Sequence, residues 1–373
     1  MIFKNGQIYN ENFELIKANL QVEDGLITAI LDPASELPTD DTVVDIQGKK
    51  IIPGFIDVHI HGSNGADTMD GTKEALETMS RYLATKGVTS FLPTTMTTAP
   101  EALYQAFSMK PQLSGANMLG FNMEGPYMNV LNRGAHREDQ VRPASIEEIR
   151  SYMELATIKL VTIAPETEGA LDFIEEISKD VVCSIGHTHA DYETTKLAIE
   201  KGAKTLTHTF NAMPGIKHRD PGVIPAAVEA GIYAELITDG VHIHPAVVYT
   251  AYKLFGKDRL IIISDAMRAA GLADGEYDLG GQMMRVKDGQ ALSPEGKIAG
   301  GTGNGHTCVT NAISYGIPEA DAIRMMTINP ATLIGEDHRK GSIAVGKDAD
   351  FLITDDALNI HQVYINGALY EQN

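Results

Sequence analysis

Two histidines separated by one residue occur in the run Asp57-Val58-His59-Ile60-His61-Gly62, directly after an apolar segment. In an extended chain alternate side chains share a face, so His59 and His61 point the same way and can hold one cation between their imidazoles. Other short apolar segments are also followed by residues of metal-binding type. These are Glu124, His187, His208 and Asp265. We therefore expect the six residues to form one metal site.

This set of ligands predicts a particular chemistry. Imidazoles and carboxylates together suit Zn²⁺, Fe²⁺ or Mn²⁺ better than an all-oxygen Mg²⁺ or Ca²⁺ cage. Because a catalytic zinc commonly has three protein ligands, six residues predict two divalent ions, with Glu124 shared between them. Such ions lower the pKa of a water molecule toward about 7 and polarise a carbonyl. Asp265 is then the general base and acid that moves a proton from this water to a leaving amine.

Each of these residues also has an ordinary alternative role, as a helix cap or a buried polar residue. Their joint placement after five apolar segments favours a site over that interpretation. His189 follows His187 by two residues but lies past the segment, and we interpret His338 and His361 as surface residues.

The segments that must position these residues alternate with stretches of helical periodicity, which is the pattern of repeated βα units. Eight runs are predicted as strands: Ile51–Ile56, Val88–Leu92, Met118–Met123, Leu160–Ala164, Val181–Ile185, Thr205–Leu206, Tyr233–Ile237 and Leu260–Ile263. Eight such units predict a TIM-like (β/α)8 barrel, of the α/β class, with a doubly wound open sheet as the competing fold. The barrel is favoured because the polar residues follow many different strands, at the end where barrels gather their chemistry.

Both ends of the chain are rich in short strands and in turn pairs of the Asn-Gly and Asp-Gly type. Because chain termini often lie close together at a domain surface, residues 1–51 and 339–373 predict one small β-sandwich domain. The barrel would then occupy residues 52–338. Further Asp-Gly and Gly-Gly pairs predict a β-hairpin insertion at about 274–297, after the eighth strand.

Composition excludes several classes of partner. The chain has 373 residues and a formal net charge of −20, which would repel nucleic-acid phosphates and anionic membranes, so neither is expected as a partner. A small phosphorylated substrate remains compatible, since a few local cations or backbone N–H groups can hold one phosphate. Two cysteines are too few for a disulfide framework, and the first residues lack a secretory signal. We expect a cytoplasmic protein.

Further motifs run in order through the predicted barrel. They are Met123-Glu124-Gly125-Pro126, Gly134-Ala135-His136, Gly186-His187-Thr188, His208-Thr209-Phe210-Asn211-Ala212-Met213, Asp239-Gly240-Val241-His242 and Ser264-Asp265-Ala266-Met267. With the His-x-His pair, they resemble the amidohydrolase superfamily and, within it, the N-acetylglucosamine-6-phosphate deacetylases. The resemblance implies hydrolysis of the N-acetyl amide of N-acetylglucosamine 6-phosphate to glucosamine 6-phosphate and acetate, in amino-sugar catabolism and recycling.

The resemblance also assigns the metal ligands. It implies one ion held by Glu124, His187 and His208, and a second held by His59, His61 and Asp265. Some members lack the His-x-His pair and use one ion, so its presence here favours two. The fourth predicted strand offers no lysine at its carboxyl end, which argues against a dihydroorotase-like or urease-like site bridged by a modified lysine.

Substrate contacts follow from the same resemblance. His136 would hydrogen-bond the acetyl carbonyl and stabilise the tetrahedral oxyanion. The other substrate-binding residues implied are Ala135, Asn211, Ala212, Arg219, Asp239, His242, Ile298, Ala299 and Gly300. Arg219 is the cation for the phosphate, with a solvated loop charge as its alternative role. Because this arginine can come from a partner subunit in the family, a homodimer is predicted.

Residues 298–306 depart from the family pattern, since additional glycines and His306 stand where members carry Gly-Ser-x-Leu-Thr. The change is expected to alter the loop that closes over the sugar. An amidohydrolase acting on another N-acyl amino sugar or N-acyl amine is therefore the alternative function. A non-catalytic binding scaffold is the alternative of another class, but it would lack ligands or the aspartate after the eighth strand, and here all are present.

Overall fold

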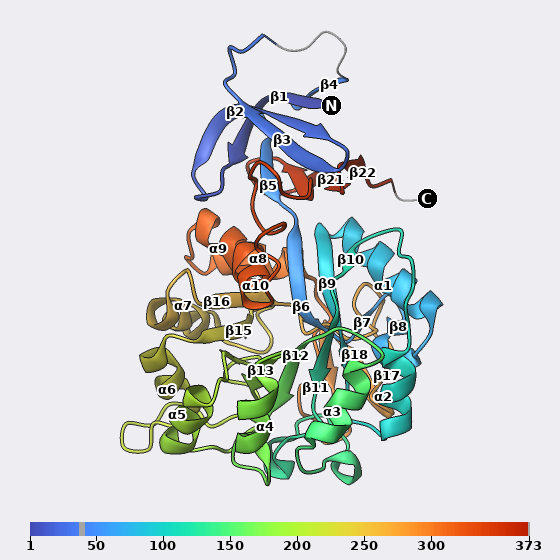
Figure 1. The fold of residues 1–373 in the computed structure, drawn as a ribbon, viewed down its shortest axis with the longest axis vertical. Helices are drawn as coiled ribbons and strands as arrows, with labels where there is room; N and C mark the ends of the chain where they lie inside the picture. Colours follow the sequence, from blue (N-terminus) through green and yellow to red (C-terminus); the bar gives the residue numbers. More distant parts are fainter. Residues whose placement is uncertain (37–41, 372–373) are drawn as a thin grey trace.

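Eight parallel strands form the central sheet of the computed structural model, which describes residues 1–36 and 42–371 (Figure 1). They are β6 (Phe55–Ile60), β9 (Val88–Thr95), β11 (Phe121–Glu124), β12 (Ile158–Ile163), β13 (Val182–Ile185), β14 (Thr205–Leu206), β15 (Tyr233–Ile237) and β16 (Leu260–Ile263). Each pairs in parallel with the next, and a short strand, β10 (Asn117–Met118), flanks β9. The backbone N–H of Asp265, just beyond β16, donates to the carbonyl of His59 in β6 at 3.0 Å and joins the last strand to the first. The predicted TIM-like barrel is confirmed.

Helices follow most of the strands and lie outside the sheet (Figure 1). They are α1 (Lys73–Thr85), α2 (Pro100–Phe107), α3 (Ile146–Met153), α4 (Ala170–Ile177), α5 (Tyr192–Glu200), α6 (Val223–Ala230), α7 (Pro245–Phe255), α8 (Gly305–Ser314), α9 (Glu319–Met325) and α10 (Ile328–Leu333), with short 3-10 turns η1 (Thr68–Asp70), η2 (Val130–Asn132) and η3 (Glu138–Gln140). In α1, Thr72 caps the first turn and Leu76, Met79 and Leu83 recur at helical spacing, so one face is buried against the sheet. Within the described ranges, no helix combines the length and apolar character needed to span a membrane.

Both chain ends form a second, eight-stranded sheet. Its strands are β1 (Ile2–Tyr9), β2 (Leu15–Glu23), β3 (Leu26–Leu31), β4 (Val43–Asp45), β5 (Lys50–Pro53), β20 (Phe351–Thr354), β21 (Ile360–Ile365) and β22 (Ala368–Leu369). The rings of Phe3, Phe351 and Tyr364 lie 4.7–5.0 Å apart in a core of its own. Residues from the two ends therefore stabilise one β unit together.

The run Ile51–Ile56, predicted as the first barrel strand, belongs instead to two sheets. β5 pairs with β1 and β20 in the small sheet, whereas β6 pairs with β9 in the barrel. The chain passes between them at Gly54, where an added Cβ would lie 2.2 Å from Oγ1 of Thr89, so a side chain would clash. The first barrel strand consequently runs further along the chain and carries His59 within it, not after it.

The segment after β16 forms a three-stranded antiparallel sheet of β17 (Gly275–Leu279), β18 (Gln282–Lys287) and β19 (Gln290–Leu292). A short hairpin, β7 (Gly62–Ser63) with β8 (Ala66–Asp67), follows β6. Leu279 and Met284 of the inserted sheet share an apolar cluster with Met96 and Met267. The insertion is thus held against the carboxyl ends of the barrel strands.

Candidate active site

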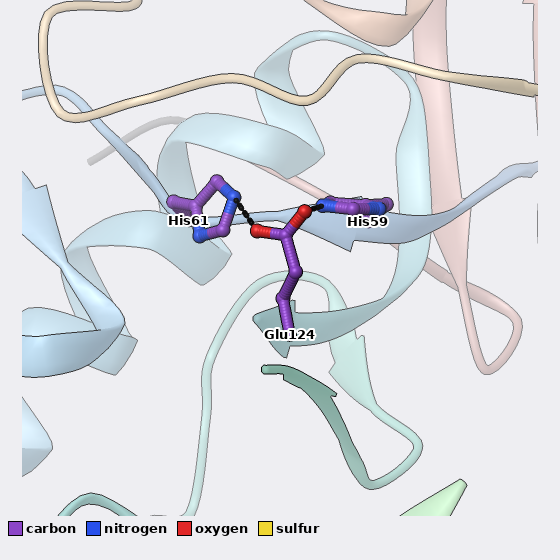
Figure 2. A group of neighbouring side chains, drawn as sticks. All are labelled: His59, His61 and Glu124. Carbon is purple, nitrogen blue, oxygen red and sulfur yellow. Dashed lines mark ion pairs between the residues drawn. The ribbon is translucent and has the colours of Figure 1, made fainter. Parts of the chain in front are cut away.

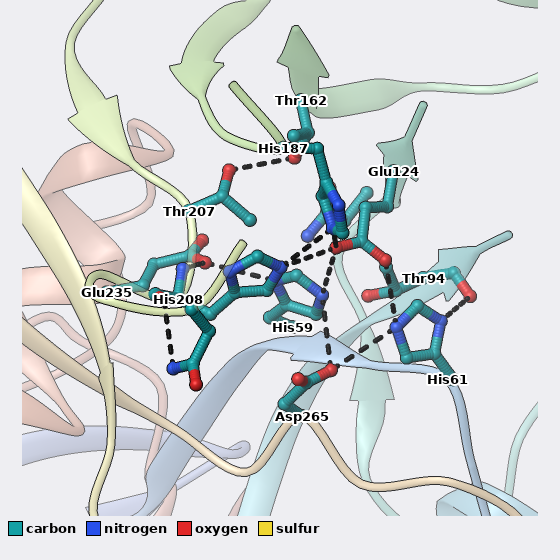
Figure 3. A network of polar contacts seen from close by, with 12 residues as sticks. His59, His61, Thr94, Glu124, Thr162, His187, Thr207, His208, Glu235 and Asp265 are labelled. Atoms are coloured by element: carbon teal, nitrogen blue, oxygen red, sulfur yellow. Dashed lines mark hydrogen bonds and ion pairs between the residues drawn. The ribbon is translucent and has the colours of Figure 1, made fainter. Parts of the chain in front are cut away.

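The six residues predicted as metal ligands meet at the carboxyl end of the barrel, and all six are buried (Figure 3). Glu124, the last residue of β11, lies at the centre. Its Oε1 is 3.0 Å from Nε2 of His187 and 2.9 Å from Nε2 of His208. Its Oε2 is 3.1 Å from Nε2 of His61. One carboxylate therefore faces imidazoles from three different strand ends.

The opposite side of the cluster contains the His-x-His pair and Asp265. Figure 2 shows His59 and His61 on either side of Glu124. Nε2 of His59 is 3.5 Å from both Oε1 of Glu124 and Oδ1 of Asp265, and Nε2 of His61 is 3.3 Å from the same Oδ1. Because β6 is extended, the two histidines project from one face, as their spacing predicts.

Three of these residues stand in an unusual backbone conformation. His187, His208 and Asp265 each lie two residues beyond the end of a strand and have φ values of 47°, 27° and 47°. Side-chain-bearing residues rarely adopt this region, which costs of order 1–3 kcal/mol each. Such strain is found where the structure must aim a functional side chain, and here all three side chains point into one cluster.

Two of the histidine rings are held by hydrogen bonds at Nδ1, the nitrogen that faces away from Glu124. Nδ1 of His61 is 3.3 Å from the carbonyl of Thr94, and Nδ1 of His187 is 2.8 Å from the carbonyl of Asn132. Since a carbonyl only accepts, Nδ1 carries a hydrogen in both rings, and Nε2 faces Glu124. Although burial opposes the shift, Asp265 and Glu124 raise the pKa of His61 to about 9, so its Nε2 carries a proton near neutral pH unless a metal ion takes the place of that proton.

The spacing of the donor atoms also fits a cation. The Nε2 and carboxylate oxygen atoms are separated by 2.9–3.5 Å. Two ligands on one tetrahedral Zn²⁺ are about 3.3 Å apart, given bonds of about 2.0–2.1 Å. Four imidazoles with two carboxylates therefore suit divalent ions in both donor type and spacing.

Glu235 is a buried residue of the site that is absent from the residues predicted above. It lies in β15, and its Oε2 is 3.0 Å from Nδ1 of His59 and 3.1 Å from the backbone N–H of His208. The sequence does contain a signal, because a single carboxylate interrupts the otherwise apolar strand Tyr233–Ile237. Its partners come from other strands and cannot be identified from that signal.

His136 differs from the six residues in its tautomer. Its Nδ1 accepts the backbone N–H of Thr97 at 3.1 Å, so Nε2 carries the hydrogen. Burial lowers its pKa to about 4, and the ring is neutral near pH 7. Nε2 is 3.2 Å from Oε2 of Glu124, within ligand distance of the cluster. An N–H at this atom nevertheless suits a carbonyl oxygen better than a cation.

The acidic groups around the cluster differ in environment. Burial would raise the pKa of Asp265, but His59 and His61 oppose this and hold it at about 2. Burial raises the pKa of Asp57 to about 6, although the backbone N–H groups of His59 and Ser264 approach its Oδ1 at 3.3 and 3.4 Å. Asp57 thus links β6 to the end of β16 behind the site.

A cavity of about 260 Å³ adjoins the cluster. Most residues predicted to bind substrate line it: Ala135, His136, Asn211, Ala212, His242, Ile298, Ala299 and Gly300. Lys297 also lines the cavity and supplies a cation not predicted above. Gln282 of the inserted sheet donates to the carbonyl of Ala135 at 2.5 Å, which fixes one cavity wall to the insertion.

Two predicted substrate residues lie outside the lining of this cavity. Asp239 accepts a hydrogen bond from Nδ1 of His242 at 2.8 Å and so contacts a residue that lines the cavity. Burial would lower the pKa of His242, but Asp239 outweighs it and raises that pKa. Arg219 is exposed in the segment between β14 and α6.

The segment 298–306 reaches the cavity only through its first three residues. His306 lies on α8, where its Nε2 is 2.8 Å from the carbonyl of Leu358, between β20 and β21. The prediction that His306 alters the loop over the sugar is therefore wrong, because its ring contacts the connection between β20 and β21 of the small sheet.

Comparison with known proteins identifies relatives along nearly the whole chain. The sequence model of the amidohydrolase family matches residues 51–369. An N-acetylglucosamine-6-phosphate deacetylase of Vibrio furnissii is 37% identical, covering 93% of this chain and 89% of the relative. An N-acetylgalactosamine-6-phosphate deacetylase of Escherichia coli O157:H7 is 34% identical, covering 94% of each.

Solved structures of proteins with the same named activity also resemble this chain along nearly its whole length. The crystal structure of N-acetylglucosamine-6-phosphate deacetylase from Pasteurella multocida superposes with a TM-score of 0.92 at 31% identity, covering 100% of this chain and 99% of that one. A mutant of the Mycobacterium smegmatis enzyme, in complex with N-acetyl-D-glucosamine 6-phosphate, gives a TM-score of 0.91 at 29% identity, covering 99% and 98%.

Proposed function

The chain belongs to the amidohydrolase family, and we propose that it removes the acetyl group from N-acetylglucosamine 6-phosphate to give glucosamine 6-phosphate and acetate. The observation that carries this proposal is the Glu124-centred cluster, with the N–H donor of His136 beside it in one cavity. The named activities of the relatives support the same reaction class, in amino-sugar metabolism.

The metal content proposed is two divalent ions per subunit, Zn²⁺, Fe²⁺ or Mn²⁺. One would be held by Glu124, His187 and His208, and the other by His59, His61 and Asp265. When bound, ions of this kind lower the pKa of a water molecule and polarise the amide carbonyl. The hydrogen bonds at Nδ1 of His61 and His187 support this assignment, because they direct Nε2 of both rings toward Glu124.

The side chains around the scissile amide then have separate roles. Asp265 accepts a proton from the attacking water and delivers it to the leaving amine, since its carboxylate lies at the rim between the cluster and the cavity. His136 donates Nε2–H to the acetyl oxygen as negative charge develops there. Burial of both groups excludes bulk water and strengthens these interactions.

Binding of the 6-phosphate completes the proposal. Lys297 lines the cavity directly, whereas Arg219 lies outside its lining and is exposed. We place Arg219 at the cavity of a second copy in a homodimer. Light scattering should therefore give twice the mass of 40.3 kDa, and Arg219→Ala should raise KM for the phosphorylated sugar.

A cytoplasmic location is proposed as well, which the free thiols of Cys183 and Cys308 support.

The deciding experiment measures acetate release from N-acetylglucosamine 6-phosphate, its unphosphorylated form and N-acetylgalactosamine 6-phosphate, on protein of determined metal content. We expect turnover of the first substrate only, with loss on chelation and recovery on adding Zn²⁺. Preference for the galactosamine isomer would favour the second candidate, which the Escherichia coli relative motivates. Metal-replete protein that cleaves none of the three would contradict the proposal.

A further inference from the structure

Glu235 lies behind the metal cluster and contacts two of its residues at once (Figure 3). The side chain is fully buried in β15. Its Oε2 accepts from the ring of His59 in β6 and from the backbone N–H of His208 after β14, whereas its Oε1 has no hydrogen-bond partner among the described residues. No role in the reaction proposed above uses this carboxylate.

A buried carboxylate with one unpaired oxygen is costly to keep. Such a group persists where a nearby positive charge compensates it. The ring of His59 connects Glu235 to the cluster, since Nδ1 faces Glu235 and Nε2 faces Glu124 and Asp265. A cation at Nε2 would therefore lie on the far side of the ring from a negative charge, in the order carboxylate, imidazole, metal.

The other imidazoles of the cluster lack this arrangement. Nδ1 of His61 and of His187 each face a neutral backbone carbonyl, and Nδ1 of His208 has no hydrogen-bond partner among the described residues. Among the four histidines predicted as ligands, His59 is thus the one whose Nδ1 donates to a carboxylate. A carboxylate raises the basicity of Nε2 more than a carbonyl does.

We infer that Glu235 is a positioning residue that commits His59 to binding a cation through Nε2 and thereby retains the ion on the His59–His61 side. The inference rests on the metal centre of the proposed function but not on its substrate. Glu235 does not line the cavity, and the one ligand ring that it contacts is that of His59, since its bond to His208 is to the backbone N–H.

The test compares metal retention in four proteins: wild type, Glu235→Gln, His59→Ala and the control Glu229→Gln. Glu229 is an exposed carboxylate of α6 that contacts Tyr192, away from the cluster. Each Zn²⁺-loaded protein is dialysed against a series of chelator concentrations, and bound zinc is measured by mass spectrometry. We expect Glu235→Gln to release one ion at about 10–100-fold lower chelator concentration than wild type, as His59→Ala does, and to retain the other. Glu229→Gln should match wild type.

A second measurement separates positioning from a purely structural role. The melting temperature of Glu235→Gln should be lower than that of wild type in the zinc-loaded proteins, and this gap should shrink in excess chelator, where no cation needs the carboxylate.

Three results would overturn the inference: retention in Glu235→Gln within twofold of wild type, unchanged retention in His59→Ala, or a melting gap that persists in chelator. Acetate release plays no part in these measurements, so failure of the proposed substrate would leave their outcome unaffected.

Discussion

Replacement of His136 by alanine tests whether this ring donates to the substrate or binds an ion. Its Nδ1 is occupied by the N–H of Thr97, so the mutation removes one N–H donor at Nε2. Loss of one such donor from an oxyanion site costs about 2.7–4 kcal/mol, which is about a 10²–10³-fold fall in kcat. We expect this fall with a metal content equal to that of wild type.

The pKa of about 4 adds a second expectation for wild type. At pH 7 the neutral form of the ring therefore predominates. Ionisation of His136 should therefore leave kcat unchanged between about pH 6 and 9, because the neutral ring is already the donor.

The assay is steady-state acetate release from N-acetylglucosamine 6-phosphate, combined with zinc analysis of the same samples. His189→Ala is the matched control, since His189 is exposed and its ring contacts Asn132 beside the cavity. His136→Ala also leaves the N–H of Thr97 without its acceptor, so the free energy of unfolding should fall by about 1–3 kcal/mol. Loss of an ion from His136→Ala, or a fall in kcat below tenfold, would refute the assignment of the tautomer.

Three further predictions concern other residues. Asp265→Asn should lower kcat by about 10²–10⁴-fold, with the zinc content of each sample measured, and undiminished turnover at normal zinc content would contradict its role in proton transfer. Lys297→Ala should raise KM for the phosphorylated sugar about two- to fivefold, less at high salt, whereas Lys287→Ala, on the same insertion, should not. Glu148 is half-buried, and although burial opposes the shift, hydrogen bonds from Arg142 and Tyr152 lower its pKa below the ordinary 4.5. The stabilisation by ionised Glu148 is present above pH 4.5 and is lost as the pH falls through the lowered pKa. The difference in unfolding free energy between wild type and Glu148→Gln should therefore shrink in that pH range. Denaturant titrations from pH 7 to pH 3 measure this difference.

The barrel could be predicted because its strands are local apolar runs. Thr205–Leu206, Tyr233–Ile237 and Leu260–Ile263 have the bounds that the sequence predicts. The run Ile51–Ile56 divides at Pro53-Gly54, a pair that can mark a break in a strand, but the sequence does not show that the first half pairs with β1 and β20 in the other sheet.

The candidate site shows the same division. Residues that follow strands on one barrel rim can be grouped from spacing alone, and the structure brings His187, His208 and Asp265 to that rim. The contacts of Glu235 cannot be predicted from the sequence, because its partners come from β6 and from beyond β14. Lys297 was missed for a different reason, since an exposed lysine in a turn has no local pattern that separates it from a solvated charge.

The backbone hydrogen bond from Asp265 to His59 joins the first barrel strand to the last at the place where the cluster forms. During synthesis, His59, His61, Glu124, His187 and His208 leave the ribosome before the carboxylate that completes their set. A nascent chain that ends before residue 265 can therefore neither close the ring nor assemble the full ligand set. The order of synthesis thus places both closure of the barrel and completion of the ligand set after residue 265 has been made.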